Sequence, residues 1–240
     1  MKSRLLVPVL TLALLPFAAA RADTVPHPKH VVFVGFDGFG SAYATESVRL
    51  PNLRRLMAEG AWTMRKQSVL PSSTAVNWTS IFTAAGPEHH GFIGAFTEKS
   101  VFPPLVTLKN GRFPDLFSGC REAEPQAKIG YVYEWGGMIH LVDTNSCDFI
   151  RRSSKPDEAG IPYLTGEKPR FMSFVFDNPD APGHKYGWGS PEYNKSLEAL
   201  DEALGRIIAA IERSGMADDT VLVFTADHGG HEKGHGQADD

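Results

Sequence analysis

The chain has 240 residues, of which 24 are Lys or Arg, 28 are Asp or Glu and 42% are hydrophobic. This length can bury a sizeable core, and the composition excludes collagen, coiled coils and disordered chains. The net charge is −4 and the chain has no run of basic residues. Both features argue against a nucleic-acid polymer as partner, because neutralising its phosphates requires clustered cations.

Residues 1–22 have the pattern of a signal peptide for export. A basic start, an apolar run and a small-residue cleavage site follow one another as Lys2 and Arg4, Leu5 to Ala19, and Ala20-Arg21-Ala22. Cleavage removes three basic and no acidic residues, which leaves residues 23–240 as one domain with a net charge of −7. No later stretch reaches the ~18 consecutive apolar residues of a membrane span, so we expect a periplasmic or secreted protein.

Two cysteines occur in the chain, Cys120 and Cys147. An exported protein meets oxidising conditions, and an even number of cysteines then favours a disulfide. We therefore expect a bridge between them, with two buried free thiols as the alternative.

Continuous apolar runs predict strands that are buried on both faces, as in parallel sheets. Three such runs occur, at His30–Phe36, Lys128–Tyr133 and Phe171–Phe176, and Thr220–Thr225 is expected to form a last strand. Capping and periodicity predict helices between them, at Pro51–Glu59, Thr74–Ala85 and from Pro191 to a stop at Gly215. Alternating strands and helices predict an α/β sandwich with a mostly parallel sheet. Two stretches that contain Pro and Gly, 97–114 and 151–168, are expected to be loop-rich.

Three acidic residues follow the ends of predicted strands: Asp37, Asp180 and Asp227. Ligands of open parallel sheets bind outside the carboxyl ends of the strands, so these residues are expected at one edge. Three carboxylates there would repel one another unless cations lay between them. The pattern therefore predicts a metal site.

Histidines accompany these carboxylates. His184 lies four residues after Asp180, His228 directly follows Asp227, and His231 and His235 stand in the Gly-rich tail. Mixed Asp and His ligands favour zinc over calcium and magnesium, which prefer oxygen ligands throughout. Five or more ligands at one edge are enough for two ions.

Thr74 begins a predicted helix, where its hydroxyl could serve simply as an N-cap. The same position also offers free N–H groups and a partial positive charge to an anion such as phosphate. A threonine hydroxyl bound to a metal there could act as a nucleophile. Asn77, three residues later, is expected on the same helix face as a donor to a phosphoryl oxygen.

Five motifs give the chain a family resemblance: FDGFG at 36–40, PSSTAVN at 71–77, GPEHHG at 86–91, PDAPGHKYG at 179–187 and TADHGG at 225–230. The chain resembles the alkaline phosphatase superfamily, most closely its type I phosphodiesterase/nucleotide pyrophosphatase branch. The motifs span nearly the whole mature chain in the family's order. The resemblance implies an alkaline-phosphatase-like fold with two zinc ions at the edge of the sheet. Family domains normally continue past the last motif into another strand, so this chain could be a fragment.

The resemblance also implies the ligands of both ions. Asp37, Thr74, Asp227 and His228 match those of the ion that activates the nucleophile. Asp180 and His184 match those of the second ion, and a third histidine should complete it. We choose His235 for that role, with His231 as the alternative. Asn77 matches the family's ligand for a phosphoryl oxygen, whereas His90, which also matches a family histidine, is interpreted as structural.

The resemblance implies a hydrolase of small phosphoric esters, of the phosphodiesterase/nucleotide pyrophosphatase type, that works through a phosphorylated Thr74. The alternatives are a phosphomonoesterase or phosphonate hydrolase with the same site, and a non-catalytic metal-binding protein of the same fold. No Arg or Lys occurs between Gln67 and Phe96. A diester, which carries one negative charge on the transferred group, is therefore the expected substrate, unless Lys185 or Lys233 supplies a cation.

Overall fold

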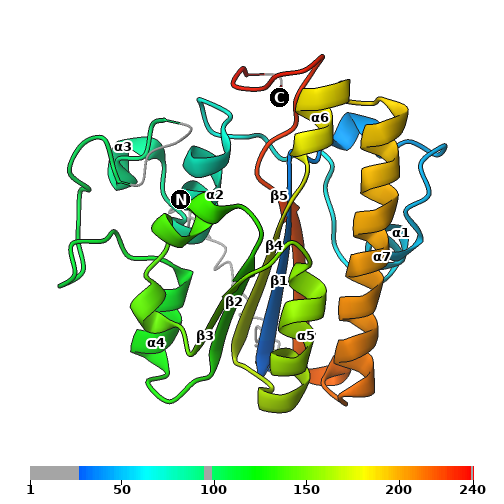
Figure 1. Ribbon diagram of the computed structural model, residues 1–240. Coiled ribbons are helices and arrows are strands. Elements are labelled where there is room, and N and C mark those ends of the chain that lie inside the picture. Colours follow the sequence, from blue (N-terminus) through cyan, green and yellow to red (C-terminus); the bar gives the residue numbers. More distant parts are fainter. Residues whose placement is uncertain (1–26, 95–98, 239) are drawn as a thin grey trace, which may run out of the picture.

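The computed structural model describes residues 27–94, 99–238 and 240, so the predicted signal peptide lies outside the described residues. Figure 1 shows a central sheet between two layers of helices. The strands are β1 (His30–Asp37), β2 (Ile129–Tyr133), β3 (Phe149–Arg152), β4 (Phe171–Pro179) and β5 (Thr220–Ala226). Their order is β3-β2-β4-β1-β5 and every neighbouring pair is parallel, which confirms the predicted architecture.

The helices cover both faces of the sheet (Figure 1). On one face lie α1 (Pro51–Glu59), α5 (Pro156–Glu167) and α7 (Pro191–Arg213), and on the other lie α2 (Thr74–Thr83) and α4 (Leu116–Ala123). The short helices α3 (Pro87–His90) and α6 (Asp180–Tyr186) lie near the carboxyl end of the sheet. Single 3-10 turns occur at Ser41–Tyr43, Gly136–His140, Thr144–Ser146 and Ala217–Asp219. Among the described residues, no helix is long and apolar enough to span a lipid bilayer.

Strand β1 occupies the centre of the fold, and its last six residues are buried. Its side chains alternate between two apolar cores: Val32, Val34 and Phe36 pack towards α7, while Phe33 packs towards α2. Gly35 lets the ring of Trp78 lie directly on the strand, since a Cβ atom at Gly35 would stand 2.2 Å from that ring. This close approach fixes α2 against the strand that ends in Asp37.

Helix α7 has the predicted core-facing stripe, and all of its members are buried: Tyr193, Leu197, Leu200, Leu204, Ile207, Ile208 and Ile211. The helix also anchors α1 through Asp201, a buried aspartate. Its carboxylate accepts the backbone N–H groups of Asn52 and Leu53 at 3.0 and 2.8 Å. These bonds satisfy N–H groups in the first turn of α1, where Leu50 at the N-cap position provides no side-chain cap.

Two expectations from the sequence do not agree with the structure. The stretch 151–168 is not a surface loop, because it completes β3 and then forms α5. Pro162 inside α5, together with Gly160 and Gly166, obscures the helical pattern in the sequence. The predicted disulfide is not formed in the structure, where Cys120 and Cys147 are both free, half-buried thiols.

Candidate functional site

Three aspartates reach the same edge of the sheet because β1 lies between β4 and β5. Asp37 ends β1, Asp180 follows β4 as the first residue of α6, and Asp227 directly follows β5. Gly38 makes the turn after Asp37 with a φ of +72°, and a Cβ atom there would lie 2.8 Å from the Cα atom of Asp180. Only glycine fits this turn without strain, so Gly38 allows the two aspartate-bearing segments to approach each other.

Asp37, Asp227 and His228 form a group that we term the buried ligand group. Their candidate donor atoms all lie within 4.8 Å of one another. The Nε2 atom of His228 is 3.5 Å from Oδ1 of Asp37 and 3.3 Å from Oδ2 of Asp227. The Thr74 hydroxyl joins this group, with Oγ1 at 3.4 Å from Oδ1 of Asp37 and 3.3 Å from Nε2 of His228.

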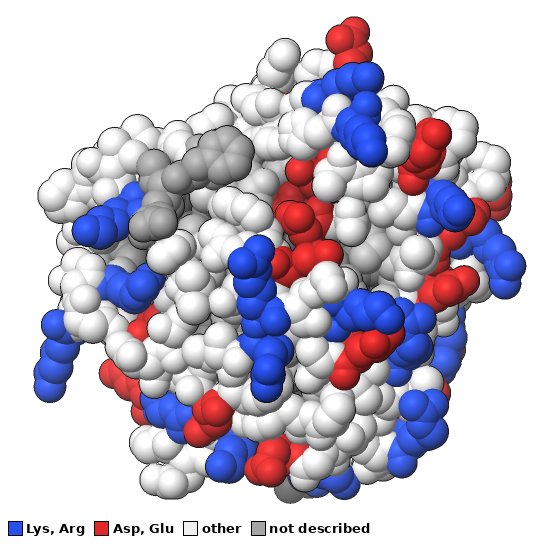
Figure 2. All heavy atoms as spheres, viewed as in Figure 1, with Lys and Arg blue, Asp and Glu red and all other residues white. Residues whose placement is uncertain are grey.

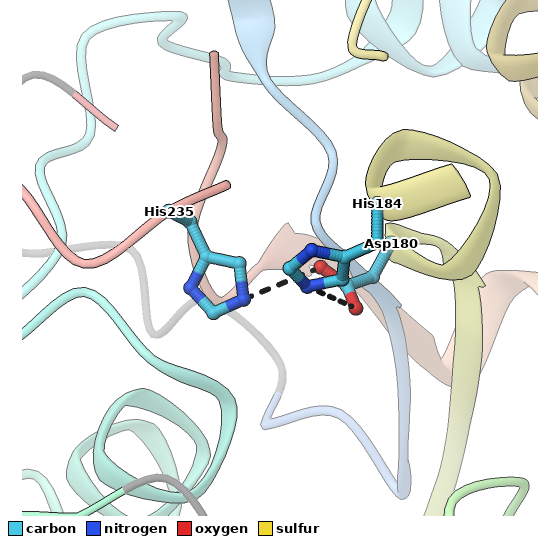
Figure 3. Close-up of side chains that lie close together, drawn as sticks. All are labelled: Asp180, His184 and His235. Atoms are coloured by element: carbon cyan, nitrogen blue, oxygen red, sulfur yellow. Dashed lines mark ion pairs between the residues drawn. The ribbon is translucent and has the colours of Figure 1, made fainter. Parts of the chain in front are cut away.

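Asp180, His184 and His235 form a second group, which we term the outer ligand group. Figure 3 shows the three side chains pointing toward one another, two from α6 and the third from the C-terminal tail. Nε2 of His184 lies 3.4 Å from one carboxylate oxygen of Asp180, and Nε2 of His235 lies 3.6 Å from the other. The rings of His235 and His228 stack at 3.9 Å, so the two groups are neighbours.

Each histidine of the two groups has its Nδ1 atom beside a backbone carbonyl oxygen. The partner is Gly229 at 2.7 Å for His228, Lys233 at 2.9 Å for His184 and Ser72 at 2.7 Å for His235. A carbonyl oxygen accepts only, so Nδ1 must carry the proton in each ring. The Nε2 lone pairs therefore point into the groups, in the arrangement that metal-binding histidines require.

The carboxylates of both groups also suit cations. Oδ1 of Asp180 and Oδ2 of Asp227 are buried and have no hydrogen-bond partner. Burial raises the pKa of Asp37 well above its ordinary value, and the carboxylates of Asp227 and Asp180 raise it further. Burial lowers the pKa of His235, which favours its neutral, ligating form. A cation in each group would supply the charge and the ligation that these atoms lack, so the residues fit a metal centre.

The ligand oxygens are oriented by a second set of hydrogen bonds. The indole N–H of Trp78 donates to Oδ2 of Asp37 at 3.0 Å, and the backbone N–H of Gly38 donates to Oδ1 of Asp227 at 3.1 Å. In each carboxylate, the other oxygen therefore stays available to a cation in the buried ligand group. This role of Trp78 is not predicted from the sequence, although its spacing of four residues from Thr74 places both on one face of α2.

Thr74 is the first helical residue of α2, and the N-cap position is held by Ser73. The Thr74 hydroxyl makes no capping bond and faces Asp37 and His228 instead. The interpretation of Thr74 as a cap is therefore wrong. Because Thr74 begins the helix, its hydroxyl lies both beside the buried ligand group and next to the free N–H groups of the first turn.

The side chain of Asn77 lies outside both ligand groups. The amide is buried, its oxygen accepts the backbone N–H of Val69 at 2.9 Å, and its Nδ2 atom donates to the carbonyls of Val69, Pro71 and Ser73. These bonds tie Asn77 to the loop before α2, and its role as a donor to a phosphoryl oxygen stays a prediction. In the structure, Asn77 shapes the loop that carries Thr74.

Lys66 is another residue that the sequence analysis missed. Its ammonium group donates to the backbone carbonyls of Ala226 and Asp227 at 2.6 and 3.0 Å. Burial lowers the pKa of this lysine, and the nearby Asp227 carboxylate opposes that shift. The contact ties the loop that precedes α2 to the end of β5. No feature of the sequence points to it, since Lys66 follows Arg65 in an irregular segment without a recognisable motif.

Three other titratable residues near the site lie outside the two groups. His231 places Nδ1 at 2.7 Å from the Asp240 carboxylate, so the outer ligand group contains His235 in its place. His90 uses both ring nitrogens, with Nδ1 accepting the N–H of Phe92 and Nε2 bonded to the hydroxyl of Ser80, as a structural histidine would. Asp177 belongs to neither group, and burial and Glu134 raise its pKa to about 7. Figure 2 shows acidic side chains in a hollow towards the carboxyl end of the sheet.

Comparison with known proteins shows one consistent family. The sequence profile of the family "Type I phosphodiesterase / nucleotide pyrophosphatase" matches residues 31–125 and 119–233. Ectonucleotide pyrophosphatase/phosphodiesterase family member 3 of Rattus norvegicus is 27% identical over 217 residues, which are 83% of this chain and 24% of the relative. A bis(5'-adenosyl)-triphosphatase of Homo sapiens is 26% identical over 219 residues, 84% of this chain and 48% of the relative.

Solved structures show the same fold. Murine ectonucleotide pyrophosphatase/phosphodiesterase 5 superposes with a TM-score of 0.68 at 20% identity, covering 83% of this chain and 57% of that one. An inactive variant of the same murine protein in complex with AMP gives the same TM-score at 19% identity, over 84% and 57% of the two chains. The chain therefore spans about a quarter to a little over half of the length of these relatives.

Proposed function

The chain belongs to the type I phosphodiesterase/nucleotide pyrophosphatase family, and from this premise we propose that it is an exported, zinc-dependent phosphodiesterase whose nucleophile is Thr74. One observation carries the proposal. The hydroxyl of Thr74 lies within 3.4 Å of both Asp37 and His228 at the first turn of α2, beside the outer ligand group. A threonine hydroxyl, the N-terminus of a helix and two groups of candidate metal ligands thus lie at one edge of the sheet, which supports the proposal.

Zinc is the metal that the donor set favours, because both groups combine carboxylate with imidazole. Asp37, Asp227, His228 and the Thr74 hydroxyl would hold one ion, and Asp180, His184 and His235 would hold the other. Two zinc ions would neutralise charge on the transferred phosphoryl group and lower the pKa of hydroxyl groups that they bind.

Thr74 would supply the bond-forming oxygen. Oγ1 attacks phosphorus, the P–O bond to one ester arm breaks, and the proton that the Thr74 hydroxyl gives up is taken up by that arm, which leaves as an alcohol. A water molecule then attacks the same phosphorus, the bond to Thr74 breaks, and a proton of that water restores the Thr74 hydroxyl. The N–H groups of the first turn of α2 favour the anionic phosphoryl group throughout. A solved relative described as inactive carries alanine in place of a threonine, which supports a threonine in this role.

The charges near the site favour a diester over a monoester. Lys66 donates to backbone carbonyls, and the ammonium of Lys185 lies over the ring of Tyr186 at 4.8 Å. Both ammonium groups are thus engaged away from the Thr74 hydroxyl, whose described partners are Asp37 and His228. Relatives named phosphodiesterase, nucleotide pyrophosphatase and bis(5'-adenosyl)-triphosphatase support a nucleotide-like ester as substrate.

The proposal also includes export from the cytoplasm. It rests on the basic start, apolar run and cleavage pattern of residues 1–22. The mature domain, 23–240, would then act in the periplasm or outside the cell.

Zinc content and turnover measured together test the proposal. Purified protein is expected to hold about two zinc ions and to hydrolyse bis-nitrophenyl phosphate. A chelator should abolish the turnover and added zinc should restore it. Protein that hydrolyses the diester equally well after complete removal of metal would refute the zinc-dependent mechanism.

A further inference from the structure

The C-terminal tail, which we define as residues 231–238 and 240, passes over the two ligand groups and is held by hydrogen bonds on both sides. On the α6 side, the backbone N–H of Trp188 donates to the carbonyl of Glu232 at 2.9 Å, and the ring of His184 donates to the carbonyl of Lys233. On the α2 side, the ring of His235 donates to the carbonyl of Ser72. Figure 1 shows this tail passing over the carboxyl end of the sheet. His235 is thus the point where the tail meets the segment that leads to Thr74.

Ser72 makes most of the described hydrogen bonds on that second side, and Ser68 adds one from its hydroxyl to the Asp240 carbonyl at 3.3 Å. Ser72 is completely buried, and its carbonyl oxygen accepts Nδ1–H of His235 at 2.7 Å. Its hydroxyl oxygen accepts the backbone N–H of Gly236 at 2.9 Å, and the hydroxyl proton is within reach of the Gln237 carbonyl at 2.8 Å and the Asp240 carboxylate at 2.9 Å. One serine therefore binds three consecutive residues of the tail, 235–237.

We infer that Ser72 is a positioning residue that holds His235 in the outer ligand group and so sets the affinity of that group for its ion; this inference rests on the proposed function. The bond to the Ser72 carbonyl fixes the proton of His235 on Nδ1 and turns Nε2 towards Asp180, 3.6 Å away. The hydroxyl holds the backbone next to His235. Because Ser72 lies two residues before Thr74, the same contact fixes the ligand relative to the nucleophile.

The hydroxyl matters more for position than for stability. The backbone N–H of Gly236 also donates to the Asp240 carboxylate, and the carbonyl of Gln237 also accepts the backbone N–H of Asp240 at 3.5 Å, so both groups keep a partner when the serine hydroxyl is removed. Removing it should therefore cost little folding free energy while letting the tail and the His235 ring move. Partners that orient a metal-binding histidine typically change metal affinity by about 10–100-fold when they are removed.

Ser73 provides a matched control for this experiment. It is the adjacent residue, it is also buried, and its hydroxyl has no hydrogen-bond partner. Zinc affinity of each group is measured in Ser72→Ala, Ser73→Ala and wild type by competition with a chelator, with elemental analysis for the number of ions. The melting temperature of each zinc-free protein reports any general loss of stability.

Ser72→Ala is expected to keep the ion of the buried ligand group and to bind the second ion, that of the outer ligand group, about 10–100-fold more weakly. Ser73→Ala is expected to bind both ions with the affinity of the wild type. Equal affinity for the second ion in the two variants would overturn the inference, whether or not the melting temperature of Ser72→Ala falls. Imidazole nitrogen NMR of the zinc-free wild type is a second test that needs no variant. The His235 proton is expected on Nδ1, and a proton on Nε2 would equally overturn the inference.

The outcome for wild type separates this inference from the proposed function. A wild-type protein that binds no zinc refutes the proposed function itself. A wild-type protein with two zinc ions, accompanied by an unaffected Ser72→Ala variant, refutes only the role of Ser72.

Discussion

The indole N–H of Trp78 donates to Oδ2 of Asp37 at 3.0 Å, which links the core of α2 directly to the candidate metal centre. Trp78 is fully buried and lies against Gly35, so its ring cannot turn away from the carboxylate. Asp37 is thereby held with Oδ1 towards Thr74 and His228. The packing of one tryptophan thus determines where a candidate ligand points.

Trp78→Phe is therefore expected to weaken zinc binding at the buried ligand group by about 10–100-fold, because Asp37 loses the donor that orients it. The free energy of unfolding should also fall by about 1–3 kcal/mol from the lost hydrogen bond and the smaller ring. Zinc competition titrations and denaturant unfolding measure the two effects. Phe82→Leu is the control, since Phe82 stacks on Trp78 in the same core without touching Asp37; equal zinc loss in both variants would refute the orienting role.

Thr74→Ala should lower the turnover of bis-nitrophenyl phosphate by at least about 10³-fold, because it removes the nucleophile. The hydroxyl makes no capping bond, so stability should change by no more than about 1 kcal/mol. Steady-state kinetics and thermal unfolding check the two parts. Retention of most of the activity would exclude Thr74 as nucleophile.

His90 predicts a specific pH dependence of stability. Burial lowers the pKa of His90 from 6.5 to about 4. Between these two values the unfolded chain binds a proton that the folded chain does not, so stability is lost as the pH falls from 6.5 towards 4. The slope from this residue is at most about 1.4 kcal/mol per pH unit. Denaturant unfolding at several pH values should show a shallower dependence for His90→Gln, and identical slopes would contradict the prediction.

The substrate preference follows from the charges near Thr74. We expect a higher kcat/KM for bis-nitrophenyl phosphate than for nitrophenyl phosphate, because a dianionic monoester would need a further cation at the phosphoryl group. Lys185→Ala should leave both values unchanged, since its ammonium lies over Tyr186. A monoester preference that disappears in Lys185→Ala or Lys233→Ala would show that a lysine supplies the missing charge.

The sequence predicts β1, β2, β4 and β5 because each is a continuous apolar run, and residues at the ends of parallel strands must share an edge. It does not predict β3, which is short and ends in two exposed arginines. It predicts the ligand histidines less directly, through the resemblance and the Gly-rich tail. Asn77 shows the limit of arguments from helix spacing: its place on α2 is as expected, but the carbonyls of the loop before α2 occupy its amide. The roles of Trp78 and Ser72 depend on contacts between distant segments, which no local pattern reveals.

The stereochemical course at phosphorus tests the central claim most directly. Two successive in-line displacements, first by Thr74 and then by water, each invert the configuration. Hydrolysis of a diester of chiral phosphorothioate in isotopically labelled water is therefore predicted to proceed with net retention. Net inversion would mean that water attacks the substrate directly, which would contradict a covalent intermediate on Thr74.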